Sequence, residues 1–122
     1  MNPSTPLTSG TDLIPSARQE GTAVIAAIRG EIDLHNSPEL RTAMLDVLLR
    51  GDPKKLVLNL DQVPYMDSSA VAVLVEALQK MRRLGGKVFL TNLQPRVKGL
   101  LEIARLDTIF IVAKDEAEAL SK

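Results

Sequence analysis

The 122-residue sequence carries 15 acidic and 15 basic side chains, so it offers no excess positive charge to nucleic acid or an anionic membrane. It contains one histidine and no cysteine, which excludes disulfides and thiolate chemistry and argues against zinc. No apolar run reaches the roughly 20 residues of a membrane-spanning helix, and no export signal opens the chain. With 45% hydrophobic residues we expect one globular, cytoplasmic domain.

The N-terminal part of the sequence predicts a tail followed by a hairpin. Residues 1–11 combine two prolines with Ser, Thr and Gly, a composition that favours disorder. We expect a single domain over residues 12–122. Within it, 12–19 carry a weak edge-strand signal, 20–21 are a Glu-Gly turn, and 22–29 are apolar enough for a strand.

Helix and strand signals alternate after the hairpin. Pro38, behind a candidate cap at Asn36 or Ser37, predicts a helix that ends near Gly51. The apolar run 56–60 is typical of a parallel strand covered on both faces. Further periodicity predicts helices over 69–84, 95–104 and 115–120, and strands over 87–91 and 109–112. The short connections favour right-handed crossovers in an α/β fold: a small, mostly parallel sheet of four to five strands with an N-terminal hairpin and about four helices.

Residues that could support catalysis are scattered. His35 is the only histidine, and nothing in the sequence places it beside a reactive serine and a carboxylate. No glycine-rich phosphate loop is present. The loop carboxylates, Asp61 among them, lack the spacing of a metal site and suit solvated or capping positions. We therefore predict no enzymatic activity, no metal and no cofactor.

The end of the predicted 69–84 helix is basic. Glu76 and Lys80 have the spacing of an i,i+4 ion pair worth roughly 0.2–0.5 kcal/mol. Lys80, Arg82 and Arg83 complement the negative end of the helix dipole. This run is either an ordinary solvated helix end or a contact for an acidic partner surface.

The segment 67–70, Asp-Ser-Ser-Ala, lies where an apolar strand gives way to a helix. Such a position offers unpaired N–H groups and the positive end of the helix dipole. One interpretation is an ordinary N-cap, with Asp67 or Ser68 accepting a hydrogen bond from the first turn. The other is a phosphorylation site, since a helix start tolerates phosphoserine while the added charge repels an acidic or apolar partner.

Several segments between residues 20 and 118 resemble, in order and spacing, the STAS family, and most closely its bacterial anti-sigma factor antagonists. The Met-Asp-Ser-Ser element after an apolar strand is the most specific of them. The segments are Gly-Glu-Ile-Asp-Leu at 30–34, Pro38 with Leu40 and Arg41, the strand 56–60, Tyr-Met-Asp-Ser-Ser at 65–69, and Gly-Gly at 85–86.

The resemblance implies a switch without catalysis. In this family the dephosphorylated antagonist binds an anti-sigma factor that is also a serine kinase, and so frees a sigma factor. The kinase phosphorylates the serine after the Asp of the motif, and a phosphatase resets it. The resemblance thus implies Ser68 as phosphoacceptor, with Ser69 less favoured, in a small monomer that binds neither nucleic acid nor membrane. The implied partner-binding residues are Asp67, Ser68, Ser69, Ala70, Asp33 and Glu31.

The sequence departs from the family pattern at Ala70 and Ala72, where the family usually has glycine. Alanine is the better helix former by up to about 1 kcal/mol, so we expect a firmer first turn. Two alternatives stay open: a stand-alone STAS subunit of a membrane transport complex, of the ABC-type lipid class, that is not phosphorylated; and a small enzyme or nucleotide binder.

Overall fold

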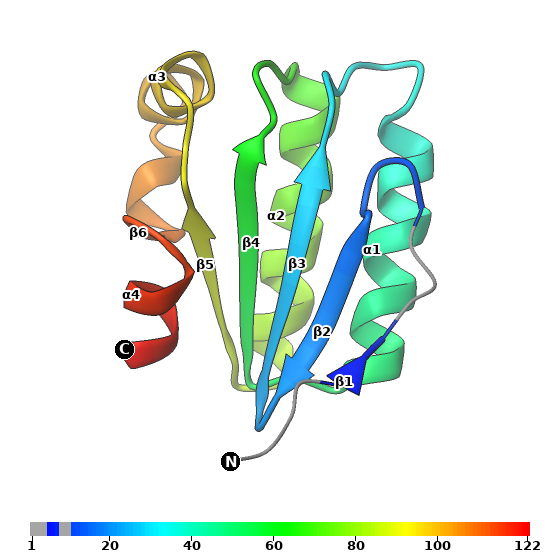
Figure 1. The fold of residues 1–122 in the computed structure, drawn as a ribbon. Coiled ribbons are helices and arrows are strands. Elements are labelled where there is room, and N and C mark those ends of the chain that lie inside the picture. The colour runs from blue at the N-terminus through cyan, green and yellow to red at the C-terminus, as the bar shows by residue number, and fades with distance from the viewer. Residues whose placement is uncertain (1–4, 8–10) are drawn as a thin grey trace.

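The computed structural model describes residues 5–7 and 11–122, and within them six strands form one sheet (Figure 1). The strands are β1 (Thr5–Pro6), β2 (Ser16–Glu20), β3 (Ala23–Arg29), β4 (Lys55–Gln62), β5 (Lys87–Thr91) and β6 (Ile111–Ala113). The helices are α1 (Ser37–Gly51), α2 (Ser68–Arg83), α3 (Pro95–Ile103) and α4 (Glu116–Ser121), with a 3-10 turn, η1, at Leu106–Thr108. The predicted α/β class is confirmed, with six strands where four to five were expected.

The strands follow one another across the sheet in sequence order. β1, β2 and β3 pair antiparallel, and β3, β4, β5 and β6 pair parallel. The predicted hairpin joins β2 to β3 through a turn at Gly21, whose φ of 61° suits glycine. The parallel strands all point toward one edge of the sheet, where α2 and α3 begin (Figure 1).

Part of the predicted tail belongs to the sheet. β1 pairs with β2, and the N–H of Leu7 donates to the carbonyl of Ala17 at 2.9 Å. The edge of a sheet tolerates the proline of β1 because its missing N–H can face solvent. Residues 1–4 and 8–10 lie outside the described residues, so disorder there stays a prediction.

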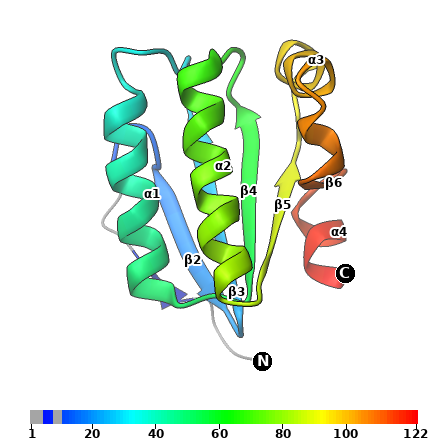
Figure 2. The ribbon, with the colours of Figure 1, turned by 180° about the vertical axis from the view of Figure 1, so that it is seen from behind.

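The main core lies between the sheet and the pair α1 and α2, which run side by side over one face (Figure 2). Apolar side chains at helical spacing fill this layer, and Leu40, Met44, Leu74 and Met81 are almost fully buried. Alternate residues of β4, such as Leu58, point into the same layer. The predicted apolar faces of both helices are therefore the faces that pack on the sheet.

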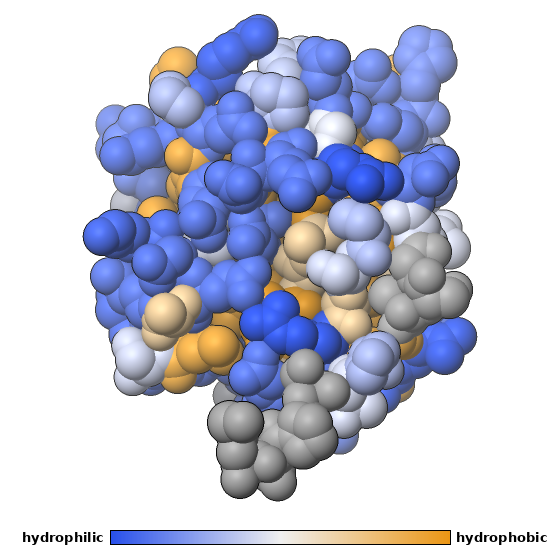
Figure 3. All heavy atoms as spheres, in the orientation of Figure 1, coloured by the Kyte–Doolittle hydropathy of each residue, from blue (hydrophilic) through white to orange (hydrophobic). Residues whose placement is uncertain are grey.

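The opposite face of the sheet is covered only in part, by α4 (Figure 1). There the Arg18 guanidinium donates to Glu116 at 2.9 Å, and the Asn59 amide donates to the other oxygen of the same carboxylate at 2.7 Å. Lys55 donates to the carbonyl of Ala119 at 2.9 Å and lies over the Phe89 ring. These bonds fasten α4, and they explain the largely hydrophilic surface of this face (Figure 3).

The predicted ion pair within α2 is wrong. Among the described residues Glu76 pairs instead with Arg41 of α1, whose Nε and Nη2 donate to the two carboxylate oxygens at 2.7 and 2.8 Å. The Arg41 hydrogen bonds are the main reason that the pKa of Glu76 is lowered. A planar guanidinium matches both oxygens at once, which the single ammonium of Lys80 cannot do.

Candidate functional site

The segment Asp67–Ala70 lies at the edge of the sheet to which the parallel strands point (Figure 1). The chain leaves β4, and Met66 then forms an isolated parallel bridge with Ile32. The N–H of Asp67 donates to the Ile32 carbonyl at 3.0 Å, and the N–H of Ile32 donates to the Tyr65 carbonyl at 3.1 Å. These backbone bonds hold the loop after β3 beside the start of α2.

Asp67 is the N-cap of α2, in an extended conformation with φ −103° and ψ −174°. Its Oδ1 accepts from the Ser69 N–H at 2.9 Å, from the Ser69 hydroxyl at 2.6 Å and from the Ala70 N–H at 3.3 Å. The Ser69 hydroxyl is the main cause that lowers the pKa of Asp67, and the backbone N–H groups of Ala70, Ser69 and Leu34 act in the same direction against desolvation. The cap is therefore a carboxylate at neutral pH, and the capping interpretation holds for Asp67.

The two serines differ in their hydrogen bonding. Ser68 is the first residue of α2 and is exposed, and within the part of the chain that the structure describes no hydrogen bond involves its hydroxyl. Ser69 is half-buried, and its hydroxyl donates to the Asp67 carboxylate. A phosphoryl donor that approaches this end of α2 therefore meets a free oxygen on Ser68 and an engaged one on Ser69.

The side chain of Ala70 is buried in this structure. Its exposed fraction is 0%, and its methyl group packs in the main core, because the third residue after the cap turns back toward the sheet. Burial in this structure shows that Ala70 helps to hold the first turn in place, and its expected role in partner binding stays a prediction. Ala72, the other alanine at a family glycine position, is exposed.

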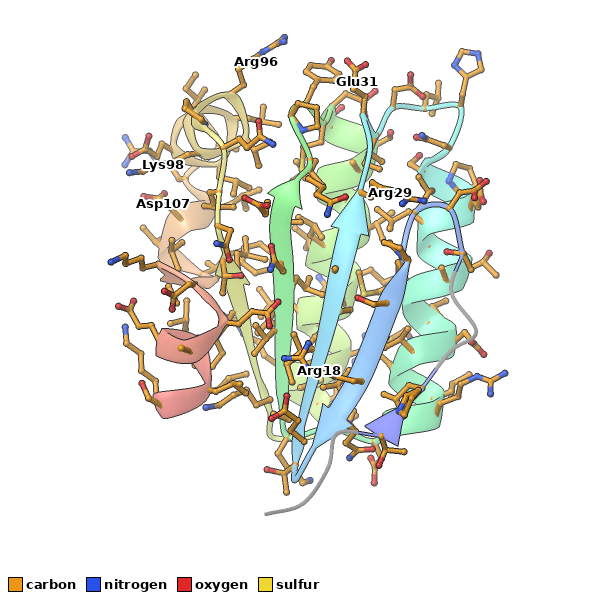
Figure 4. All side chains as sticks on the ribbon, in the orientation of Figure 1. Arg18, Arg29, Glu31, Arg96, Lys98 and Asp107 are labelled. Atoms are coloured by element: carbon orange, nitrogen blue, oxygen red, sulfur yellow. The ribbon has the colours of Figure 1, made fainter. Side chains whose placement is uncertain are left out.

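Glu31 and Asp33 lie in the loop that the backbone brings beside Asp67. Asp33 is half-buried, and its Oδ1 accepts from the His35 N–H at 2.9 Å. Asn36 does occupy the N-cap position of α1, but its side chain makes no capping bond: it accepts from the Asp33 N–H at 2.8 Å and donates to the Glu31 carbonyl at 2.9 Å. The Glu31 side chain is exposed at this end of the molecule (Figure 4).

A groove of about 500 Å³ separates the serine site from α3. Sequence reasoning missed its far wall, which comes from α3 some 30 residues along the chain. The Arg96 guanidinium lies 5.0 Å from the centre of the Tyr65 ring, and Ile103 is 86% exposed. An isoleucine outside the apolar stripe of a helix was a signal available in the sequence. The groove is lined by Tyr65, Met66, Asp67, Ser68, Arg96, Gly99, Leu100 and Ile103.

Two further observations concern residues 5–7 and 11–122. In these ranges no helix is long and apolar enough to cross a membrane. Over the same ranges, no three side chains of His, Cys, Asp or Glu gather closely enough to hold a metal ion. Asp67 and Asp33 each accept local hydrogen bonds.

Comparison with known proteins gives a family match over most of the chain: the model of the STAS domain matches residues 15–119. The anti-sigma-B factor antagonist of Bacillus subtilis (strain 168) is 33% identical over 100 residues, which cover 81% of this chain and 90% of that protein. The anti-sigma F factor antagonist of Paenibacillus polymyxa is 28% identical over 99 residues, covering 81% of this chain and 85% of that protein.

Solved structures share the fold at lower identity. The anti-sigma factor antagonist SpoIIAA in its unphosphorylated form has a TM-score of 0.72 at 22% identity, covering 86% of this chain and 91% of that chain. The Bacillus cell fate determinant SpoIIAA has also been solved in a phosphorylated form, with a TM-score of 0.63, 22% identity, and 84% of this chain and 91% of that chain covered. A sulfate transporter family protein from Wolinella succinogenes gives 0.70 at 21% identity, covering 84% of each chain.

Proposed function

This chain belongs to the STAS domain family, and from that premise we propose that it is an anti-sigma factor antagonist whose activity is switched by phosphorylation of Ser68. In its dephosphorylated form it binds an anti-sigma factor that is also a serine kinase, and a sigma factor is released. The observation that carries the proposal is the free, exposed Ser68 hydroxyl beside an engaged Ser69 hydroxyl. The relative from B. subtilis, 33% identical, is named an anti-sigma-B factor antagonist.

The partner surface that we propose is centred on Ser68. The loop with Glu31 and Asp33 lies on one side of it, and the groove with Tyr65 and Arg96 lies on the other. Asp67 contributes through its cap, which fixes the direction in which the Ser68 side chain leaves the helix. A partner that covers this surface buries the Ser68 hydroxyl at its centre.

Phosphorylation would change the charge of that surface without unfolding the domain. The kinase transfers the terminal phosphoryl group of ATP to Ser68 Oγ: the new O–P bond replaces the bond to the ADP leaving group, and the hydroxyl proton goes to a base of the kinase. The product carries a charge of about −1.5 to −2 next to the ionised Asp67. The start of α2 tolerates this charge through its dipole, whereas an acidic or apolar partner surface is repelled.

The partners follow from this cycle. The protein binds the anti-sigma factor kinase in one state and serves as substrate for a serine phosphatase in the other. We propose that it works as a cytoplasmic monomer without catalytic activity of its own. SpoIIAA, which shares the fold, has been solved in both unphosphorylated and phosphorylated forms.

The test uses the cognate anti-sigma factor kinase with ATP, and mass spectrometry to locate the phosphate. We expect modification at Ser68 in the wild-type protein and in Ser69→Ala, and none in Ser68→Ala. By calorimetric titration, Ser68→Asp should bind the kinase at least about 100-fold more weakly, or about 2.7 kcal/mol, whereas Ser68→Ala should bind normally.

Phosphate on Ser69 alone, or Ser68→Asp binding as tightly as wild type, would contradict the proposal. Because Ser68 is exposed and Asp67 supplies the cap, neither substitution at residue 68 should lower Tm by more than about 2 °C. A larger loss would mean that Ser68 is a structural residue.

A second candidate function is that of a stand-alone STAS subunit of a membrane transport complex, bound to its ATPase and not phosphorylated. It stays open because the Wolinella sulfate transporter family protein shares this fold, and because Ala70 stands where the family pattern has glycine. The two candidates differ in the protein that co-purifies with the chain. A transporter ATPase in the pull-down would replace the first proposal, and a serine kinase would remove the second.

A further inference from the structure

A second groove lies at the other end of α2, between the last turns of α1 and α2, which run side by side (Figure 2). Its volume is about 350 Å³, and it is lined by Leu45, Leu48, Leu49, Lys80, Arg83 and Leu84. Four of these six residues are leucines. Leu49 is 84% exposed and Leu84 is 47% exposed, although the core below them is well filled. Side chains of this size are seldom left in water as neighbours unless another surface covers them.

The rim of this groove is positively charged. Of its lining residues Lys80 and Arg83 are cations, and within residues 5–7 and 11–122 neither takes part in an ion pair. The two acidic side chains of the adjoining helix turns already have partners: Glu76 is held by Arg41, and Asp46 is held by Arg50 at 2.9 Å. Lys54 adds a third cation, since its ammonium donates to the Leu84 carbonyl at 3.2 Å.

We propose that this groove is a second docking site and that its occupant is an acidic amphipathic helix of another protein. A helix that lays leucine-like side chains into a groove between two helices is a common mode of recognition. Acidic residues along the edges of that helix would meet Lys80 and Arg83. This assigns Lys80 and Arg83 of the basic run at the end of α2 to an acidic partner surface and not to a merely solvated helix end.

Other occupants fit the charge and shape less well. A second copy of this chain that uses the same groove would bring two basic rims together, at a cost in electrostatic energy. The N-terminal segment 1–11 contains no acidic residue, so it cannot complement the rim. A flat anionic membrane would meet the rim but would not fill a concave apolar surface between two helices.

The groove is separate from the serine site. Ser68 and Lys80 lie 12 residues apart on one helix, which at 1.5 Å per residue is about 18 Å. Both sites can therefore be occupied at once, and the proposal does not depend on the phosphorylation of Ser68. The domain would act as an adaptor, with a regulated contact at one end of α2 and a constant contact at the other.

The test uses two synthetic amphipathic peptides of about 18 residues with leucine at helical spacing and either glutamate or lysine elsewhere. Amide NMR spectra of the full chain are recorded during titration. We expect the glutamate peptide to shift the signals of residues 45–49 and 80–84, and to bind at least 10-fold more tightly than the lysine peptide. Its binding should weaken as salt is raised.

Matched variants distinguish binding in this groove from nonspecific binding of the peptide elsewhere on the surface. Leu49→Asp and Arg83→Glu should each weaken the glutamate peptide at least 5-fold. The controls Ile103→Asp, which removes an equally exposed isoleucine, and Lys98→Glu, an exposed cation of α3, should bind it as wild type does. Ser68→Asp should also leave it unchanged. All five positions are exposed, so folding should be retained, which circular dichroism can check.

Four results would overturn the proposal: no shift with the glutamate peptide, equal binding of both peptides, shifts confined to other residues, or an equal loss of binding in the control variants. Tighter binding to vesicles with anionic lipid than to the peptide, lost in Leu49→Asp, would make the groove a membrane contact instead. A dimer in light scattering that Leu49→Asp dissociates would assign the groove to a second copy.

Discussion

At its N-terminal end α2 begins with an ionised aspartate and a free hydroxyl, whereas at its C-terminal end two leucine-lined helix turns carry a cluster of cations. The first end is built from polar groups whose hydrogen bonds are fixed locally, as between Asp67 and Ser69. The second has exposed apolar side chains, and the cations Lys80 and Arg83 have no ion-pair partner among the described residues.

The contrast shows how one helix can serve two different contacts. The dipole of α2 favours the anionic cap at one end and the cations at the other, so both clusters stabilise the helix before any partner is bound. A covalent charge at Ser68 changes the first contact and leaves the second about 18 Å away. Substitutions at the two ends should therefore have separable effects, and the predictions below test that separation.

The largest effect on stability is expected at Gly86, which follows the end of α2 and lies close to Met81 and Lys54. A Cβ at Gly86 would lie 2.6 Å from Met81 Cε and 2.8 Å from the Lys54 carbonyl oxygen, and the latter is backbone that cannot turn aside. Gly86→Ala should lower the free energy of unfolding by about 1–3 kcal/mol in urea titrations. It should also alter the structure of the groove at the C-terminal end of α2 more than it alters the surroundings of Ser68.

Gly99→Ala is the control for this substitution, because a Cβ at Gly99 meets no atom within 4 Å. It should leave stability unchanged or raise it by up to about 1 kcal/mol through helix propensity. Equal stability of Gly86→Ala and wild type would show that the C-terminal end of α2 is looser than the structure indicates.

At the other end, Asp67→Ala removes the cap and should lower Tm by about 5 °C at pH 7. The folded-state pKa of Asp67 lies below its ordinary value of 3.8. The stabilisation from its charge is therefore present above pH 3.8 and is lost as the pH falls through the folded-state pKa. The Tm gap between wild type and Asp67→Asn should narrow over that range.

Because the pKa values of Glu76 and Glu116 are lowered as well, only the difference between Asp67→Asn and wild type reports on the cap. Thermal unfolding of both proteins from neutral pH down to about pH 2.5 measures it. If the Tm difference between wild type and Asp67→Asn widened as the pH fell, the lowered pKa assigned to Asp67 would be contradicted.

A charge exchange tests the dipole argument directly. Arg83→Glu places an anion at the negative end of α2 and should lower stability by about 0.3–1 kcal/mol, whereas Ser68→Glu places an anion at the positive end and should not lower it. Urea unfolding at low and high salt provides the measurement. If both substitutions lower the free energy of unfolding by the same amount, the two ends of α2 are electrostatically alike.

The smallest effect is expected midway along α2, at the exposed Arg41–Glu76 pair. Arg41→Gln and Glu76→Gln should each change Tm by less than about 4 °C, and neither should alter kinase binding or peptide binding. A double-mutant cycle in Tm gives the coupling between them. A large coupling would mean that this pair, and not apolar packing alone, sets the position of α1 against α2.

Much of the fold was predictable because local signals and tertiary packing agree. The predicted strand 87–91 coincides with β5, and the predicted helix at 69–84 differs from α2 by one residue at each end. These elements combine strong hydrophobic periodicity with a clear stop, the left-handed Gly85 with its φ of 76°. β1 was missed because two residues carry no periodicity, and only pairing with β2 defines them.

Some features of the candidate site could likewise be predicted from local sequence, and others could not. The motif at residues 67–69 is local, so its place at a helix start and the capping role of Asp67 could be read from the chain. The ion-pair partner of Glu76 could not be predicted from the sequence, because Arg41 lies 35 residues away. Arg41 competes with Lys80, which is close to Glu76 along the chain. The burial of Ala70 could be predicted, since Ala70 belongs to the apolar stripe of the helical pattern.

The sequence by itself determined the family, the α/β order of elements and the position of two serines at a helix start, because short-range pattern and motif spacing encode all three. Tertiary structure alone decided which distant segments meet. It placed residues 31–33 beside Asp67 through backbone bonds, set Arg96 and Ile103 across a groove from Ser68, and brought Leu49 next to the cations of α2. These contacts depend on helix packing and strand register, which no single stretch of sequence specifies.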